Sequence, residues 1–470
     1  MFAHHPRNIF IHKNRRSSLS FLAGILVVGG LFFYSHLAKA VPSYARQTEQ
    51  SCVACHAGGQ FPELTPYGRK FKLLGYTMGQ QANPFSAMLV IDYSKLKNNT
   101  LSDGSGLTQK DAQWLINQGS VFIAGKVTNN IGLFSQFTYA PYDHQNDVGK
   151  WVGHAGSDNF DLRYADQNVT SSSDLIWGLT FHNNITVQDP WNTVQAWGYP
   201  YMTRAGAFSV PNDVPYATAL DGPLGQFAGT GAYLYLNNNI YLELTGYQTA
   251  KNAFSVLSMG SHAVNSNGSV LTYIDGIAPY ARVAYTKEWG PHNVMLGASY
   301  LDIKVYPFTT DVNNTNIATD FSSGVTHYQD KAIDGQYQYL LSPHTITAQF
   351  RYVRETIRDQ TGTYATTAPV NLNSFRAKMS YIYQAKYGAS LAYKTVTGDS
   401  DTLAYVNSSL FSPNSTLCTR EIFWIPVQNM RVGLQYNYFT KYAGASNNYD
   451  GAGRNAKDNN STYIYLWMAY

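Results

Sequence analysis

The sequence has few cysteines and few charged residues, and each shortage excludes a class of protein. Three cysteines in 470 residues rule out a disulfide-rich scaffold. Charged residues make up 13% of the chain, but hydrophobic residues make up 44%, which is too many for a disordered protein. Beyond residues 1–40 no apolar stretch is long enough for a membrane-spanning helix, so a helical membrane bundle is excluded as well.

The positive net charge comes from the N-terminus. The chain has 33 basic and 29 acidic residues, a formal net charge of +4. Five of the basic residues and none of the acidic ones lie in residues 1–40, so the remainder carries 28 basic and 29 acidic residues and a net charge of −1. A chain without excess basic charge is not expected to bind nucleic acid.

Residues 1–40 have the layout of a secretory signal peptide. A basic stretch to Ser18 precedes an apolar stretch from Leu19 to Leu37, and Ala38-Lys39-Ala40 is an A-x-A cleavage site. An uncleaved membrane anchor is the alternative, but the small-residue site directly after the apolar stretch favours cleavage. The mature protein is therefore expected in an oxidising compartment, which is the periplasm in a Gram-negative cell.

A C-x-x-C-H motif follows soon after the predicted cleavage site. Cys52 and Cys55 are one helical turn apart, and His56 is adjacent to the second thiol. This pattern predicts covalent attachment of one c-type haem, with His56 as the proximal ligand of its iron. A dithiol redox site and half of a zinc site are the alternatives, but neither a thioredoxin-like βαβ pattern nor a second Cys/His pair is present. Cys418 stands alone and is interpreted as an incidental thiol.

The residues after the motif predict a short helix and some contacts to the haem. Thr65-Pro66 is a helix start, and Gly75 is a helix end. Arg69 and Lys72 could pair with the anionic haem propionates, although a solvated basic face explains them equally well. Met78 is the candidate for the second axial ligand, with a remote ligand or an open position as alternatives. Met88 lies in an expected strand and is assigned to a core or lipid-facing position.

From residue 86 the apolar residues recur with period two, which is typical of strands. Between Met430 and Tyr438, for example, Val432 and Leu434 alternate with Arg431 and Gly433. This pattern predicts sixteen strands, at 86–95, 119–128, 131–140, 158–165, 174–182, 230–237, 239–247, 279–287, 292–302, 332–341, 345–355, 372–383, 386–395, 419–427, 430–440 and 461–470.

The connections between these strands alternate between short turns and long loops. An even strand number with this asymmetry is typical of outer-membrane barrels, and aromatic girdles at the two interfaces explain the 37 tyrosines. We therefore expect an all-β protein: residues 86–470 form a 16-stranded antiparallel outer-membrane barrel, and residues 41–85 form a monohaem cytochrome segment. Residues 41–85 are too few to fold without support, so we expect the segment to enter the barrel from the periplasm and to plug its lumen.

These residues resemble the fused cytochrome–porin outer-membrane Fe(II) oxidases of iron-oxidising bacteria. The specific resemblance covers Cys52–His56, the stretch from Pro62 to Pro66 and the stretch from Gly68 to Tyr76. Val187–Asn192, with Asp189, and Trp197–Tyr201 resemble the barrel of that family. The residues 57–60 after His56 are a departure, because the spacing before Phe61-Pro62 is tighter in relatives.

The resemblance implies an oxidoreductase that accepts single electrons from extracellular Fe(II) through its haem. The implied acceptor is a periplasmic carrier, either a rusticyanin-type copper protein or a c-type cytochrome. Two other functions stay open: a diffusion porin with a structural or sensory haem segment, and a conduit for another donor. No iron ligand set can be assigned; Asp143, His144, Asp147 and Asp158 lie on an expected outer loop, where ordinary solvated residues are the more economical interpretation.

Overall fold

The computed structural model describes residues 43–59, 62–108, 111–145, 150–194, 213–221, 227–258, 271–310 and 317–470. The predicted signal peptide, residues 1–40, lies outside these residues. None of the described helices is long and apolar enough to cross a membrane.

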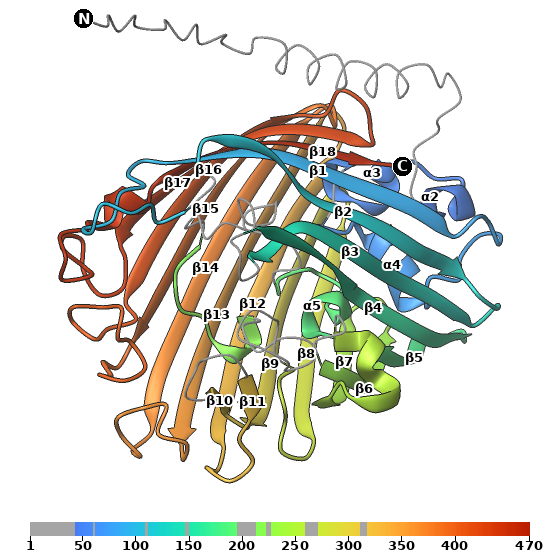
Figure 1. The fold of residues 1–470 in the computed structure, drawn as a ribbon. Coiled ribbons are helices and arrows are strands. Elements are labelled where there is room, and N and C mark those ends of the chain that lie inside the picture. Colours follow the sequence, from blue (N-terminus) through green and yellow to red (C-terminus); the bar gives the residue numbers. More distant parts are fainter. Residues whose placement is uncertain are drawn as a thin grey trace, which may run out of the picture. The chain divides into compact units, whose positions relative to one another are not determined.

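Sixteen of the described strands close into one antiparallel barrel, as the sequence predicts (Figure 1). The barrel closes where β1 pairs with β18, with Met88 opposite Ala469. Two further strands, β10 (Phe308–Thr310) and β11 (Ile317–Thr319), form a small separate sheet. The barrel strands are β1 (Phe85–Leu96), β2 (Gln113–Lys126), β3 (Ile131–Gln145), β4 (Trp151–Val169), β5 (Asp174–His182), β6 (Phe227–Leu236), β7 (Ile240–Thr249), β8 (Ala278–Trp289), β9 (His292–Val305), β12 (Thr326–Leu341), β13 (His344–Asp359), β14 (Val370–Tyr383), β15 (Tyr387–Gly398), β16 (Ser415–Trp424), β17 (Met430–Lys441) and β18 (Ser461–Ala469).

The connections confirm the predicted asymmetry of the two barrel ends. At the end where β1 begins and β18 finishes, the strands are joined by turns of two to five residues, and we call this the short-turn end. The turn between β6 and β7 has Asn237 and Asn238 at φ of 51° and 55°, the left-handed conformation that a tight hairpin requires and asparagine tolerates. Most connections at the opposite end are longer, such as 183–226 and 442–460.

One of the outer connections is shorter than predicted. Strands β3 and β4 extend to Gln145 and from Trp151, so only residues 146–150 join them. Register shifts around Ser135 and Ala140 allow the two long strands to stay paired. The expectation of a long loop that carries Asp143, His144 and Asp158 was therefore wrong, because all three residues are in strands.

Side chains alternate between the lumen and the outer face of the barrel. In β17, Arg431, Gln435 and Asn437 are buried inside, whereas Leu434 and Tyr436 are exposed outside. Large apolar residues are exposed on the outer face of other strands too; Leu244 is 69% and Leu391 61% exposed. An apolar outer face around a polar interior is the arrangement of a barrel embedded in lipid.

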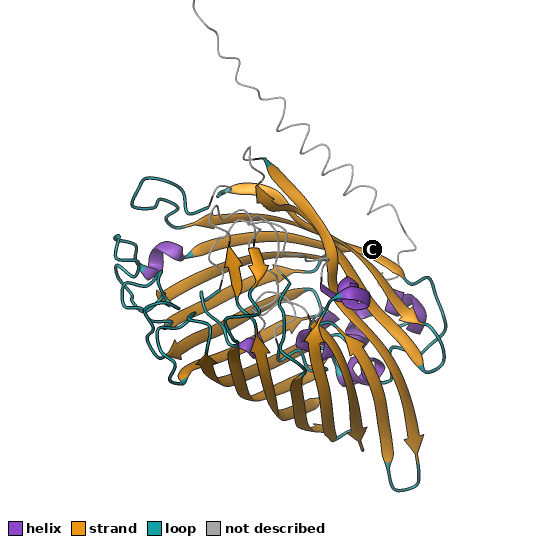
Figure 2. Cartoon of the chain, turned by 60° about the horizontal axis from the view of Figure 1, so that its bottom comes forward, coloured by secondary structure: helices purple, strands orange, loops and turns teal. Residues whose placement is uncertain are grey.

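The N-terminal segment, residues 43–84, contributes three α-helices to the interior at the short-turn end (Figure 2). These are α2 (Ser43–Thr48), α3 (Cys52–Cys55) and α4 (Pro66–Leu73), with a 3-10 turn η1 (Ala57–Gly59) after α3. The predicted boundaries of α4 are confirmed: the Thr65 hydroxyl accepts a hydrogen bond from the Gly68 N–H, and Gly75 follows with φ +66°.

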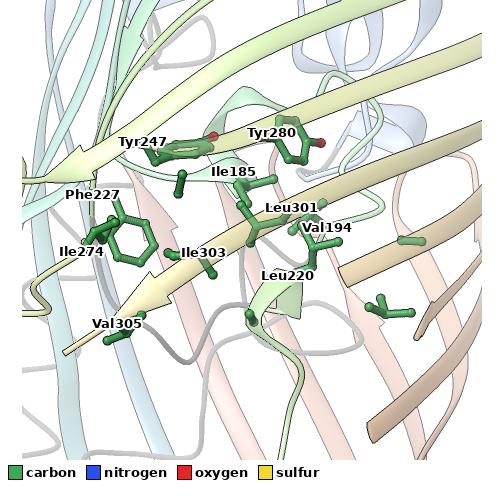
Figure 3. Close-up of a cluster of buried hydrophobic side chains, with 14 residues drawn as sticks. Ile185, Val194, Leu220, Phe227, Tyr247, Ile274, Tyr280, Leu301, Ile303 and Val305 are labelled. Carbon is green, nitrogen blue, oxygen red and sulfur yellow. The ribbon is translucent and has the colours of Figure 1, made fainter. Parts of the chain in front are cut away.

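The β5–β6 connection also folds into the lumen. It contains α5 (Ile185–Gln188) and η2 (Ala219–Asp221), and its residues 195–212 and 222–226 lie outside the described residues. Ile185, Val194 and Leu220 pack there against Phe227, Tyr247, Leu301 and other inward side chains of the barrel (Figure 3). This buried apolar cluster explains why a long outer connection lies inside the barrel. Two short 3-10 helices, η3 (Asn252–Ser258) and η4 (Ala456–Asn459), belong to other connections.

Candidate functional site

The C-x-x-C-H motif lies on a single helical turn inside the barrel. Cys52 and Cys55 begin and end α3, and both are free thiols. The chain leaves the helix at His56, whose backbone N–H donates to the Cys52 carbonyl at 2.8 Å. His56 then forms an antiparallel bridge with Leu64, so the chain folds back and brings α4 beside the motif.

Burial keeps the three motif side chains uncharged. It lowers the pKa of His56 to about 4, so the imidazole is neutral, which is the form that binds a metal ion. Burial raises the pKa of Cys55 to about 11, with a smaller contribution from the neighbouring Cys52 thiol. The pKa of Cys52 is raised too, again because of burial.

A cavity of about 260 Å³ lies between this motif and the barrel wall. Cys52, Cys55 and His56 all line it, and most of its other walls are apolar. The N-terminal segment supplies aromatic residues, and β1, β2, β3 and β18 complete the enclosure; the larger side chains are Tyr44, Phe71, Met88, Phe122, Phe134 and Trp467. The volume is slightly below the range of about 300–1,000 Å³ for small-molecule sites. The lining, with two thiols, a neutral imidazole and mainly apolar side chains, is chemically suited to an apolar cofactor held by covalent bonds.

The two methionines nearest to the motif, Met78 and Met88, lie in different surroundings in the structure. Met88 is buried in β1 with its side chain inward, and it lines the cavity. Met78 is not among the described residues that line the cavity, and its carbonyl accepts a hydrogen bond from the Gln47 side chain. Neither observation tests axial ligation of the haem iron, so the role of Met78 as the second axial ligand stays a prediction.

Arg69 is bound to the barrel wall. Its guanidinium donates to Asn293 Oδ1 at 2.8 Å and to Gln338 Oε1 at 3.1 Å, and it lies 3.8 Å from Glu288. Burial lowers the pKa of Arg69 to about 10, which still leaves it charged at neutral pH. Arg69 does not line the cavity in the described structure, so its role here is to hold α4 against β9 and β12.

Lys72 combines a contact to the β5–β6 connection with a position at the cavity. Its ammonium donates to the Asp189 carbonyl at 3.0 Å, and the residue also lines the cavity. Burial lowers the pKa of Lys72 to about 8, and the nearby Arg163 adds to this effect. Of the two residues predicted to meet haem propionates, Lys72 alone is at the cavity edge, and the propionate contacts of both stay predictions.

Glu63 provides a further attachment that the sequence analysis missed. Its buried carboxylate forms an ion pair with Lys378 of β14, which is also buried. Nearby, the Glu421 carboxylate lies 3.0 Å from Arg431. A single acidic residue on a short segment carries no signal of its own, because its partner is more than 300 residues away in the chain.

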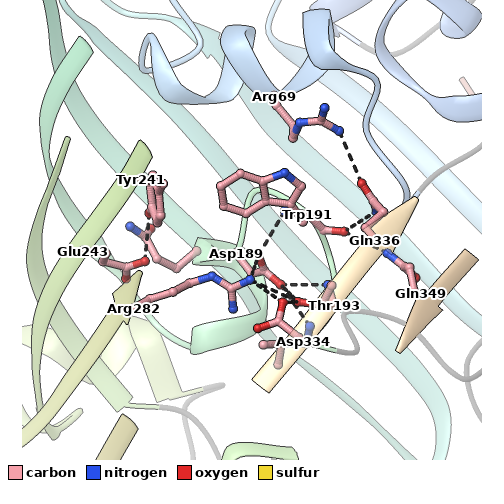
Figure 4. A network of polar contacts seen from close by, with 12 residues as sticks. Arg69, Asp189, Trp191, Thr193, Tyr241, Glu243, Arg282, Asp334, Gln336 and Gln349 are labelled. Carbon is pink, nitrogen blue, oxygen red and sulfur yellow. Dashed lines mark hydrogen bonds and ion pairs between the residues drawn. The ribbon is translucent and has the colours of Figure 1, made fainter. Parts of the chain in front are cut away.

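Asp189, which had been given no role, organises the inward part of the β5–β6 connection (Figure 4). Its carboxylate accepts hydrogen bonds from the backbone N–H groups of Trp191, Thr193 and Val194 at 2.8 to 3.0 Å. It also lies 3.6 Å from the Arg282 guanidinium. Burial alone would raise the pKa of Asp189, but Arg282 and these N–H groups outweigh burial and lower it.

The same connection contacts the N-terminal segment. The Asn192 side-chain amide donates to the Pro62 carbonyl at 2.6 Å, and Trp191, which is fully buried, accepts through its carbonyl from Gln336 and Gln349. The resemblance stretch Val187–Asn192 therefore lies against the segment that carries the C-x-x-C-H motif. Its counterpart, Trp197–Tyr201, lies outside the described residues.

The residues weighed as iron ligands do not form a site in the described part of the chain. Asp158 lies in β4, where its carboxylate accepts from the Thr138 hydroxyl at 3.1 Å. Asp147 and the side chains of Asp143 and His144 lie outside the described residues. Among the residues that are described, no group of three or more His, Cys, Asp or Glu could hold a metal ion.

Comparison with known proteins finds similar structures but no matching sequence. No protein-family model and no curated protein sequence matches the chain. Among solved structures, it is similar to the outer-membrane protein OmpT of Vibrio cholerae (12% identity, TM-score 0.44, 82% of this chain and 98% of that one). It is also similar to the outer-membrane channel DcaP of Acinetobacter baumannii (10%, 0.46, 82% and 96%) and to an anion-selective porin from Comamonas acidovorans (8%, 0.41, 82% and 98%).

Proposed function

We propose that this protein is an outer-membrane c-type cytochrome, in which a porin-type barrel holds one covalently attached haem c and passes single electrons across the membrane. The observation that carries the proposal is the cavity, because Cys52, Cys55 and His56 all line the same partly open, mainly apolar space inside the barrel. When bound, the haem supplies one-electron chemistry. The extracellular donor is Fe(II), and this choice rests on the sequence resemblance.

The chain's own residues hold the cofactor and shield it. Cys52 and Cys55 form the two thioether bonds, and His56 provides the proximal nitrogen. Aromatic residues such as Phe71 and Trp467 line the cavity and contribute to its apolar walls. Lys72 places a positive charge at its edge, where an anionic group on the cofactor is stabilised.

The proposed direction of electron transfer, from outside to the periplasm, is based on which end of the barrel faces which side of the membrane. Short turns face the periplasm in outer-membrane barrels, so the N-terminal segment is open to a periplasmic acceptor such as a rusticyanin-type copper protein or a cytochrome c. From the outer end, the β5–β6 connection reaches this segment through the Asn192–Pro62 and Asp189–Lys72 contacts. The described part of this outer connection is thus in direct contact with the haem segment. Transfer of one electron rearranges no bonds, so no acid–base residue is required.

A diffusion porin with a structural or sensory haem segment is the second candidate. The closed sixteen-stranded barrel favours it, because a barrel of this size encloses a wide aqueous lumen unless it is plugged. Against it stand the buried contacts of Glu63 and Arg69 with the barrel wall, which hold the segment inside the lumen.

Two measurements on the purified full-length protein test the proposal. The first is the absorbance spectrum before and after stopped-flow mixing with Fe(II), with a Cys52→Ala/Cys55→Ala variant as the control. We expect a c-type haem that becomes reduced, and no covalent haem in the variant. If the haem stays oxidised with Fe(II) but is reduced by another donor, that donor replaces Fe(II) as the proposed substrate.

The second measurement is liposome swelling in sugar solutions. A conduit with a plugged lumen is expected to leave the liposomes impermeable. Swelling as fast as with a general porin, or the absence of covalent haem from the periplasmically matured protein, refutes the proposed conduit and favours the diffusion porin.

A further inference from the structure

Charged side chains are distributed unevenly over the outer face of the barrel. Four basic residues are exposed close together on β9, β12 and β13, which are neighbours in the barrel: Lys304, Lys331, Arg354 and Arg358. We call these four residues the basic patch. Other outward basic residues stand apart from the patch: Lys287 lies near the short-turn end of β8, Lys95 on β1 and Arg420 on β16.

Strand pairing brings the positive charges of the patch directly opposite one another. Lys331 of β12 is paired with Arg354 of β13. His327 is paired with Arg358 on one side and with Lys304 on the other, so these three residues form a row across three strands. Like charges that face each other across a sheet destabilise it, unless an anion lies between them.

The described outward side chains of these three strands include one carboxylate, and it is already occupied. Asp302 Oδ1 lies 2.7 Å from His327 Nε2, and Asp302 Oδ2 accepts from Gln329 at 2.8 Å and from Tyr300 at 3.0 Å. Within the described residues, none of the four basic side chains forms an ion pair with a carboxylate. On these three strands, the described outward carboxylates therefore do not balance the positive charge of the patch.

The patch lies at the outer edge of the expected lipid layer. Lys331 and Arg354 are each ten residues from the short-turn end of their strand. At about 3.3 Å per residue and a tilt of about 40°, this places them roughly 25 Å above that end, which is the height of the apolar band of such barrels. Lys304 and Arg358 lie beyond it. Below the patch, Ile333 and Phe350 are exposed on the same face.

We propose that the basic patch binds the phosphate-bearing headgroup of a glycolipid in the outer leaflet of the membrane. Arginine presents a planar pair of N–H donors that fits phosphate, and lysine adds a mobile point charge. The exposed apolar side chains below the patch provide a surface for the acyl chains of the same lipid. A soluble anion would have no use for that apolar surface, so the arrangement assigns the site to a lipid.

Native mass spectrometry of the full-length protein tests this assignment, with diphosphorylated lipid A as the probe. We expect the wild type to retain bound lipid, and the Lys331→Gln/Arg354→Gln variant to bind it about tenfold more weakly, since charge-assisted hydrogen bonds are lost. The matched control is Lys95→Gln/Arg420→Gln, which removes two outward basic residues elsewhere and should bind as the wild type does. Circular dichroism checks that both variants are folded barrels.

Four outcomes of this experiment overturn the proposal. Equal binding of lipid A by the wild type and the patch variant shows that the patch does not hold the lipid. Equal binding of dephosphorylated and diphosphorylated lipid A by the wild type shows that phosphate is not recognised. If millimolar inorganic phosphate displaces the lipid, the patch is a site for free anions. If an oligomer dissociates in the patch variant while lipid binding is unchanged, the patch is an interface between copies of the chain.

Discussion

Gly68 lies so close to Cys55 that no other residue fits at its position. A Cβ atom at residue 68 would be 2.1 Å from the Cys55 carbonyl oxygen. This close approach seats α4 against the turn that carries both thiols, so the backbone at Gly68 helps to shape the cavity wall. It is a relationship between two backbones, which no rearrangement of side chains can relieve.

We therefore expect Gly68→Ala to displace α4 from the motif. The steric overlap costs about 1–3 kcal/mol or more, because backbone atoms must move. The fraction of purified protein with covalent haem, measured from the haem absorbance per polypeptide, should fall. Gly119→Ala is the control, since the nearest atom to its Cβ would be 3.9 Å away. An unchanged haem fraction in Gly68→Ala contradicts the role assigned to this contact.

The buried ion pair between Glu63 and Lys378 should behave as a coupled unit. Removal of either partner alone leaves an uncompensated buried charge and costs about 3–5 kcal/mol. Glu63→Gln or Lys378→Met is expected to expose the N-terminal segment to protease, as followed by limited proteolysis and N-terminal sequencing. The double variant should regain much of the protection. If both single variants resist protease as the wild type does, the pair does not hold the segment.

Asp189 should control the position of the β5–β6 connection. Asp189→Ala removes the acceptor of three backbone N–H groups and one of the two carboxylates beside Arg282, which should release the connection from the lumen. Liposome swelling in small sugars should then increase. Asp103→Ala, an exposed aspartate that accepts only from Ser105, is the matched control and should leave permeability unchanged. Equal permeability of both variants would falsify this role.

Acid should loosen the contact of Asp221 with the barrel wall. Burial by itself would raise the pKa of Asp221, but the guanidinium groups of Arg376 and Arg351, at 3.3 and 3.5 Å, outweigh it and lower the pKa to about 2. A lowered folded pKa contributes stability above the unfolded value of about 3.9, and this stability is lost as the pH falls through 2.

For Asp221 the shift corresponds to roughly 2–3 kcal/mol at pH 5 and above. Thermal unfolding of wild type and Asp221→Asn between pH 5 and pH 1.5 measures it. The stability difference between the two proteins should be constant down to about pH 4 and should shrink as the pH approaches 2. A difference that does not depend on pH shows that the ionisation of Asp221 is not what stabilises the fold.

Much of the fold could be predicted because its signals are local. The period-two alternation identified all sixteen barrel strands, and β5 was placed at its observed bounds of Asp174–His182. The predicted ends of β3 and β4 were wrong. Both strands extend further than expected through shifts of register, and small or polar residues in the extensions hide the period-two pattern. Thr65 and Gly75 were recognised as helix boundaries for the same local reason.

The site could be predicted only in part. The C-x-x-C-H motif depends on spacing within one helical turn, so Cys52, Cys55 and His56 were found as neighbours. The propionate contact considered for Arg69 stays a prediction, but its contacts with Asn293 and Gln338 were not foreseen, because both are more than 200 residues away in the chain. Nothing in the local sequence around Glu63 or Asp189 indicates that their partners are Lys378 and Arg282.

By itself, the sequence determined the repeating chemistry of this protein: a strand whose side chains alternate, a turn where asparagine tolerates a positive φ, and a helical turn with two thiols. Each of these depends on residues a few positions apart, where chain geometry leaves little choice. Only the closure of the barrel decided which side chains meet in its interior. Buried charges such as Glu63 and Arg282 must find partners wherever the wall presents them, and that depends on strand order and register across the whole chain.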